Sequence, residues 1–312
     1  MSYSDEVRVS VQYQEIGKRL RAFRLGSGLS ADDIAKRLGI SRTAVYRFEK
    51  GEVVKIETLT GLAELLNVSL ATLLGAESEY ISSAVTYFER LRQLEAEATQ
   101  IIVLASPISL LLASDEFQEA LETLLKESVP EGTSHRDRAL ADIDRIIEIL
   151  RERRENYALR RPAVVNLLSA HDIVRLLRSG FVGQPFIPPE DLDLRRERAR
   201  HEVEHFINLI ESEPIGIQVG LVIGTLPHTS FQIFRNGDRK TLSISPFRLG
   251  EQPNIRLGVA MITNTDEAIS LHERIIEQMW SEALKGREAA DYLRGLIEAI
   301  DRENGRLPAK QA

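Results

Sequence analysis

Residues 29–51 read LSADDIAKRLGISRTAVYRFEKG, and this stretch contains two short helical patterns separated by a tight turn. The first pattern begins after Ser30, a favourable N-cap residue, and ends at Gly39. The second begins after Ser41, another N-cap residue, and covers Arg42–Lys50. The turn needs a residue that tolerates a positive φ angle, and glycine meets that need.

Three further helical patterns surround this pair. Tyr13–Leu25 precedes it, and Ile56–Leu66 and Leu70–Leu74 follow it. Two consecutive short helices joined by a tight turn form a helix-turn-helix. We therefore predict an all-α unit of five helices within residues 1–76, here called the head.

Apolar, capping and glycine positions recur through residues 13–75 at fixed spacing: Leu29-Ser30, Ile34-Ala35, Leu38-Gly39-Ile40-Ser41, Val45, Phe48-Glu49-Lys50-Gly51, Leu59, Leu62-Ala63, Leu66, Val68-Ser69 and Leu73-Leu74. This set resembles the helix-turn-helix domains of the Cro and lambda-type repressors, the XRE family. The resemblance implies that the head binds DNA and that its third helix enters the major groove.

The resemblance also assigns expected roles to side chains of the third helix. Arg42 and Arg47 would pair with guanine, and the Thr43 methyl group would contact thymine. Tyr46 and Lys50 would contact phosphates. The full set of expected DNA-contacting residues is Lys36, Ser41, Arg42, Thr43, Tyr46, Arg47 and Lys50.

Two other positions bear on this expectation. Many members of the family have a phosphate-contacting glutamine where this chain has Ala31, so backbone amides or Lys36 would make that contact here. Arg24 and Glu49 stand where the family has a structural ion pair between the first and third helices. Two other interpretations stay open: the head binds a protein instead, or the arginines of the third helix are only solvated charges.

Charge and composition agree with a DNA-binding head on a larger body. Residues 1–75 carry 11 lysines and arginines against 9 acidic residues, a net charge of +2, and the remainder carries 29 against 38, a net charge of −9. With 43% hydrophobic residues in 312, we expect two folded domains. The chain has no cysteine, which excludes disulfides, a cysteine nucleophile and thiolate metal sites.

No membrane or secretory segment is expected. Residues 1–14 lack the apolar core of a signal peptide. The longest apolar stretch, Ile101–Ala113, is shorter than the roughly 20 residues that cross a bilayer. We interpret it as a buried strand followed by a turn, in a soluble cytoplasmic protein.

Residues 77–98 are expected to connect the head to the body. Glu79–Ala98 reads as one helix with Ile81, Val85, Phe88, Leu91 and Leu94 at heptad-like spacing. Part of a dimer interface and core packing within the body are both compatible with this pattern.

The body, residues 99–312, is predicted to be an α/β domain with a mixed sheet. The expected strands are Gln100–Ala105, Ala163–Leu168, Ile217–Ile223, Ser230–Arg235, Lys240–Ser245 and Leu257–Thr263. The expected helices are Asp115–Lys126, Asp137–Glu155, Ala170–Arg178, Asp191–Ile210, Thr265–Leu284 and Arg287–Glu303.

Asn236-Gly237 predicts a hairpin turn between two of these strands. Alternation places Phe231, Ile233, Leu242 and Ile244 on one face and polar residues on the other. The polar face lines an effector pocket or is a solvated sheet surface. The expected effector-binding residues are His228, Ser230, Gln232, Ser243 and Ser245, with Arg161 as a basic neighbour.

Two patterns raise the possibility of an enzyme. The hairpin is faintly similar to the phospholipase D fold, whose His-x-Lys pair acts on phosphodiesters, but His228-Thr229-Ser230 lacks the lysine. His201 to His205 satisfy H-E-x-x-H, a zinc peptidase pattern, without an evident third ligand. We interpret His201 and His205 as weak metal candidates on a solvated helix face, and we expect no cofactor.

The sequence thus favours a non-enzymatic transcription regulator over two rivals. The expected protein is a repressor that binds an inverted-repeat DNA operator as a homodimer or higher even oligomer. The body would bind an unknown small-molecule effector, without any membrane partner. The rivals are a DNA-binding head fused to a phosphodiesterase or zinc peptidase, and a protein-interaction module such as an antitoxin.

Overall fold

The computed structural model describes residues 3–76, 78–104, 107–184, 186–224, 227, 229–250 and 252–303, with side chains from Tyr13 onward. The head consists of five helices, as predicted. They are α1 (Tyr3–Ser27), α2 (Ala31–Leu38), α3 (Arg42–Glu49), α4 (Ile56–Leu65) and α5 (Leu70–Leu74). The bounds of α2 to α5 agree with the prediction to within one residue, whereas α1 begins at Tyr3 rather than at Tyr13.

Side-chain caps and a left-handed glycine fix the turn between α2 and α3. The hydroxyl oxygen of Ser30 accepts from the amide of Asp33 (3.1 Å), and the Asp33 carboxylate accepts from the amide of Ser30 (2.9 Å). Gly39 ends α2 with a φ of 66°. Ser41 then accepts from the amide of Ala44 (3.1 Å) and starts α3.

Two glycines let α1 approach α3 and the loop after it. A Cβ on Gly17 would lie 2.5 Å from the carbonyl oxygen of Phe48. Gly51 has a φ of 90°, and a Cβ there would lie 2.7 Å from the Cα of Gln14. Neither place has room for a side chain, so glycine is required by space at both and by conformation at Gly51.

The body is built on a mixed sheet of eight strands in the order β1-β7-β6-β5-β2-β3-β4-β8. Strands β2, β3 and β4 are parallel to one another, and the other pairings are antiparallel. The strands are β1 (Glu79–Ile81), β2 (Gln100–Leu104), β3 (Ala163–Ser169), β4 (Ile217–Val222), β5 (Ser230–Asn236), β6 (Arg239–Ser245), β7 (Ala260–Thr263) and β8 (Leu284–Lys285).

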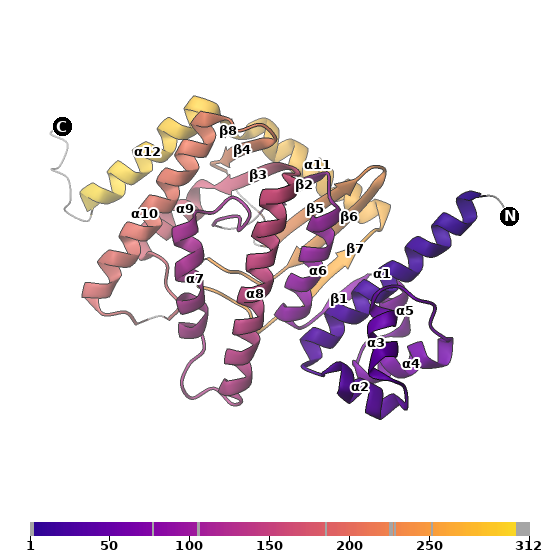
Figure 1. Ribbon diagram of the computed structural model, residues 1–312. Coiled ribbons are helices and arrows are strands. Elements are labelled where there is room, and N and C mark those ends of the chain that lie inside the picture. Colours follow the sequence, from indigo (N-terminus) through magenta and orange to yellow (C-terminus); the bar gives the residue numbers. More distant parts are fainter. Residues whose placement is uncertain are drawn as a thin grey trace.

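Helices cover both faces of this sheet (Figure 1). Those on the larger layer are α6 (Ala84–Glu97), α7 (Asp115–Glu127), α8 (Arg136–Arg160), α9 (Ala170–Ser179), α10 (Pro189–Ser212) and α12 (Gly286–Glu303). The other face is covered by α11 (Asp266–Glu282), which packs Ile269, Ile276 and Met279 against it. None of the described helices is both long and apolar enough to span a bilayer.

The hairpin of β5 and β6 has the predicted register, but its polar face lies inside the protein. Phe231 pairs with Ile244 and Ile233 with Leu242, while Gln232 pairs with Ser243 on the opposite face. Ser243 is completely buried, and its hydroxyl group lies 3.0 Å from that of Tyr87 on α6. The interpretation of this face as a solvated surface is therefore wrong, because α6 covers it.

The segment predicted as one helix, Glu79–Ala98, divides into the edge strand β1 and the helix α6. Its heptad-like apolar residues, such as Val85, Phe88 and Leu91, are at most 3% exposed and belong to the chain's own core. Of the two interpretations, core packing is the correct one. A dimer interface on these residues is excluded because they have no free surface.

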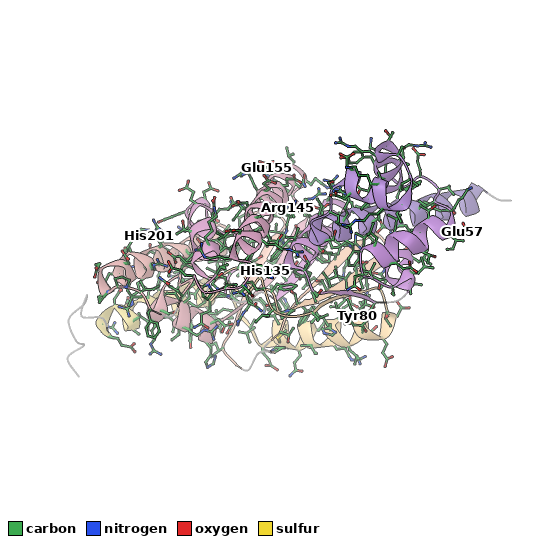
Figure 2. The ribbon with its side chains drawn as sticks, turned by 90° about the horizontal axis from the view of Figure 1, so that it is seen from below. Glu57, Tyr80, His135, Arg145, Glu155 and His201 are labelled. Carbon is green, nitrogen blue, oxygen red and sulfur yellow. The ribbon has the colours of Figure 1, made fainter. Side chains whose placement is uncertain are left out.

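One core runs from the head into the body. In Figure 1, α1 lies alongside α6, and residues from both helices belong to the same buried apolar cluster. At their crossing, a Cβ on Gly26 would lie 1.8 Å from the hydroxyl oxygen of Thr86, so α1 has no room for a side chain there. The helix α8 adds a polar contact, since Arg145, beside the head in Figure 2, donates to the carbonyl of Leu25 (3.0 Å).

A buried ion triad lies at the same junction. The Glu79 carboxylate accepts hydrogen bonds at 2.8 Å from Arg19 of α1 and from two nitrogens of Arg90 of α6. The charges of the two arginines outweigh the effect of burial, which alone would raise the pKa of Glu79, and hold that pKa below its ordinary value of 4.5. The triad ties three elements together: the first helix of the head, the edge strand and α6.

Candidate nucleic-acid interface

The outward face of α3 is exposed to solvent. Val45 is completely buried beneath it, which fixes the rotation of the helix. Thr43, Arg42 and Arg47 are exposed on the opposite side, and about 60% of each arginine side chain is accessible. The residues expected to contact bases therefore share one solvent-facing surface.

The ion pair expected from the family resemblance is present, and it holds α3 against α1. Arg24 donates to Glu49 through Nε at 2.5 Å and through Nη2 at 3.1 Å. Both side chains are largely buried, at 12% and 6% exposure. A bidentate pair at this depth fixes the position of α3 relative to the longest helix of the head.

Neighbouring acidic and aromatic groups hold both exposed arginines. Arg42 lies 3.4 Å from the carboxylate of Asp32, and its guanidinium lies 5.5 Å from the ring centre of Tyr46. Arg47 donates to Glu52 at 2.6 Å, and this hydrogen bond lowers the pKa of the Glu52 carboxyl. Each guanidinium is thereby oriented before any ligand arrives, but Glu52 also competes with phosphate for Arg47.

The other expected contacts fall into two groups. Lys36 and Lys50 are exposed and free to approach a phosphate backbone. Tyr46 is exposed as well, but its hydroxyl group accepts a hydrogen bond from Nη2 of Arg42 at 3.3 Å. Ser41 is exposed as well, but its hydroxyl oxygen already caps α3. The acidic partners Asp32 and Glu52 were not foreseen from the sequence; the five-residue separation of Arg47 and Glu52 across Gly51 is the signal that could have revealed the second.

Four of the expected effector residues lie together in the body. Ser230, Gln232, Ser243 and Ser245 share the inner face of the hairpin. Three of these four line a small cavity beneath α6, namely Ser230, Gln232 and Ser245, and His228 lies outside the described residues.

The basic neighbour of this cavity was assigned wrongly. Arg161 follows α8 just before β3, beside the sheet end where Ala163 pairs with Gln100, whereas the cavity lies at the other end of β2, where Leu104 pairs with Phe231. The arginines that line the cavity are Arg153 and Arg248. Arg153 could have been suspected from its place on an inward-facing turn of a long helix.

The H-E-x-x-H residues are held by hydrogen bonds and ion pairs within the chain. Glu202 is 1% exposed and accepts from the amide of Ser114 at 3.0 Å. The Nε2 atom of His205 lies 2.9 Å from the carbonyl oxygen of Leu112, and His201 is half-exposed beside two glutamates. The prediction of a solvated helix face is correct for His201 and wrong for His205, which faces the 112–114 segment as Glu202 does. Within the described residues, no three potential ligands cluster into a metal site.

Comparison with known proteins identifies the head. Residues 15–74 match the family model of a helix-turn-helix domain. No curated protein matches the chain. The chain therefore carries a helix-turn-helix domain at residues 15–74, the type of domain with which transcription regulators bind DNA.

Proposed function

We propose that this protein is a sequence-specific transcription repressor of the XRE type, which binds an inverted-repeat operator as a dimer. The body senses a small molecule and acts on the head. Repression follows from the family resemblance of the head.

The observation that carries the proposal is the solvent-facing basic surface of α3. Arg42 and Arg47 stand on an exposed helix whose rotation is fixed by Val45 and by the Arg24–Glu49 pair. A recognition helix needs this combination, because base readout requires long donors on a rigid support.

Dimerisation follows from the small size of the head. One α3 helix presents few side chains to base edges, whereas two heads on a two-fold axis read half-sites about 10 base pairs apart or a multiple of that distance. We assign the dimer contact to a surface of the body other than the buried face of α6.

We also propose that the body is not an enzyme. Ser230 occupies the place of the lysine in the His-x-Lys pair of phospholipase D. Glu202, the glutamate of the zinc peptidase pattern, is buried and bonded to Ser114. These residues therefore lack the lysine of the phosphodiesterase pair, and they do not leave the zinc peptidase glutamate free to act as a base.

The test is to select genomic fragments with the purified protein, define the operator by footprinting, and measure binding by fluorescence anisotropy over a range of salt concentrations. Replacing Arg42 and Arg47 with alanine should weaken operator binding by roughly tenfold or more for each lost base contact. Arg287→Ala, at an exposed position near the start of α12, is the control for losing a surface arginine away from α3 and should bind as the wild type does. Undiminished binding by the double variant would overturn the proposal.

A further inference from the structure

A small cavity lies beneath α6 and α8, at the carboxyl end of β2, where the parallel part of the sheet meets the antiparallel hairpin. Its volume is about 60 Å³, and its lining includes Phe88, Arg153, Ser230, Gln232, Ser245 and Phe247. In Figure 1, α6 and α8 pass in front of the sheet. The cavity thus lies outside the carboxyl end of a parallel strand, which is the side of an α/β sheet on which ligands commonly bind.

Two buried polar groups in the lining have no hydrogen-bond partner among the described residues. Arg153 is 3% exposed; it binds Glu95 through Nε and Nη2, but its Nη1 is unpaired. The Oε1 atom of Gln232 is also buried and unpaired. Buried donors and acceptors in folded proteins are nearly always satisfied, so a further molecule in the cavity is expected to pair with these groups.

The orientation of Arg153 is fixed independently of any ligand. The bidentate pair with Glu95 holds one edge of the guanidinium, and the ring of Phe88 lies 5.7 Å from its central carbon. The free Nη1 is therefore a preorganised donor. Glu95 neutralises Arg153, but Arg248 also lines the cavity and forms no ion pair within the described chain, which leaves a net positive charge.

These groups define the ligand by its chemistry. The Arg153 donor and the positive charge of Arg248 favour a carboxylate, and the Gln232 acceptor requires a donor such as a hydroxyl group. Since one water needs about 10–15 Å³ of such space, a 60 Å³ cavity holds roughly four to six non-hydrogen atoms. We propose that this cavity binds a small 2-hydroxycarboxylate.

The position of the cavity gives this ligand a route to the head. Tyr87, Phe88 and Leu91 of α6 line the cavity, while Arg90 and Gln93 of the same helix bind the junction with α1. The regulatory use of the site therefore rests on the proposed function. Ligand binding itself does not, and it is measured without DNA.

The test is isothermal titration calorimetry of the full chain with glycolate and L-lactate, with propionate and 1,2-propanediol as probes that lack the hydroxyl or the carboxylate. We expect at least one hydroxy acid to bind. The affinity of each analogue should be lower than that of the hydroxy acid by about tenfold or more. Gln232→Leu should abolish that preference over propionate while the chain stays folded by circular dichroism, and Gln218→Leu, at an exposed position on β4, should retain it.

A second variant keeps the test independent of core packing. Arg248 is exposed, so Arg248→Ala is expected to fold normally and to bind the hydroxy acid more weakly. The proposal is overturned if neither hydroxy acid binds at 10-fold excess over millimolar protein, or if a crystal grown with L-lactate holds only water between Arg153 and Gln232. Loss of operator binding in the head variants would leave these measurements unchanged, so the two proposals fail separately.

Discussion

Replacing Glu79 with alanine should strongly destabilise the junction between head and body. The Glu79 carboxylate is 4% exposed and is the acceptor for three hydrogen bonds at 2.8 Å from two arginines. Its removal leaves the guanidinium groups of Arg19 and Arg90 buried without their counter-ion. An uncompensated buried charge costs far more than an intact pair contributes.

The expected loss is about 3 kcal/mol, at the lower end of the roughly 3–5 kcal/mol typical of breaking a buried pair. The lower end applies because Arg90 keeps a hydrogen bond to Gln93 at 2.6 Å. Arg19, at 6% exposure, is the residue that carries the larger penalty.

Urea unfolding can measure this loss with two separate signals. Far-UV circular dichroism reports all helices, and the fluorescence of Trp280, the chain's single tryptophan, reports α11 in the body. Because head and body share one core, both transitions of Glu79→Ala should shift together to lower urea concentration with an unchanged slope. Glu64→Ala, at an exposed position on α4, is the control and should shift neither signal appreciably.

A loss below about 1 kcal/mol would refute the reasoning, since that is the range of exposed pairs. A second check replaces all three residues by apolar ones, as Arg19→Met, Glu79→Leu and Arg90→Leu, which should recover most of the lost stability because none of the triad's charges remains buried without a partner. Acid provides a third check. The pKa of Glu79 is lower in the folded state than its ordinary value of 4.5, so its stabilisation is present above pH 4.5 and is lost as the pH falls towards the folded pKa. The stability of Glu79→Ala should therefore fall less steeply below pH 4.5 than that of the wild type.

Three further predictions concern the head. Glu52→Gln should raise affinity for DNA by about two- to fivefold in anisotropy titrations at low salt, since it frees Arg47 at an exposed site; an unchanged affinity would mean that Glu52 does not compete with phosphate. Arg24→Ala should cost roughly 1–3 kcal/mol in thermal unfolding by leaving Glu49 buried and unpaired, and a loss within error would remove the pair as the support of α3. Gly51→Ala should lower the free energy of unfolding by roughly 2 kcal/mol or more, because its Cβ would meet the Cα of Gln14. Gly28→Ala also has a positive φ but lies in open space, so it should lower that free energy by only about 1 kcal/mol. Equal losses in thermal unfolding would show that the close approach at Gly51 is unimportant.

The head could be predicted almost residue by residue, because its signals are local. Caps at Ser30 and Ser41 and the left-handed Gly39 act over one turn, so the sequence alone places α2 and α3. The Asn236-Gly237 turn likewise predicts which side chains of β5 and β6 share a face of the sheet. Segments distant in the sequence determine what covers each face of a strand or helix, and local signals do not predict those contacts.

The polar face of the hairpin illustrates the limit. Its serines and glutamine are typical of a solvated surface, and segments distant in the sequence, α6 among them, cover them. The same helix was ambiguous for the same reason, since heptad-like spacing describes an apolar face without naming its partner. Arg161 precedes a strand, but the cavity lies at the opposite end of the neighbouring strands, and the local sequence does not determine which end of a strand a distant segment contacts.

The buried junction changes how the head is expected to read DNA. A head on a flexible linker could adjust to several half-site spacings, whereas here α1, β1 and α6 share one core and one ion triad. In the proposed dimer, the distance between the two α3 helices is then set by the body, so the operator should tolerate little change in spacing. A ligand in the body can alter operator binding only through a different affinity for two arrangements of this junction. The α6 helix, with the cavity on one side and the triad on the other, is the element whose displacement would distinguish those arrangements.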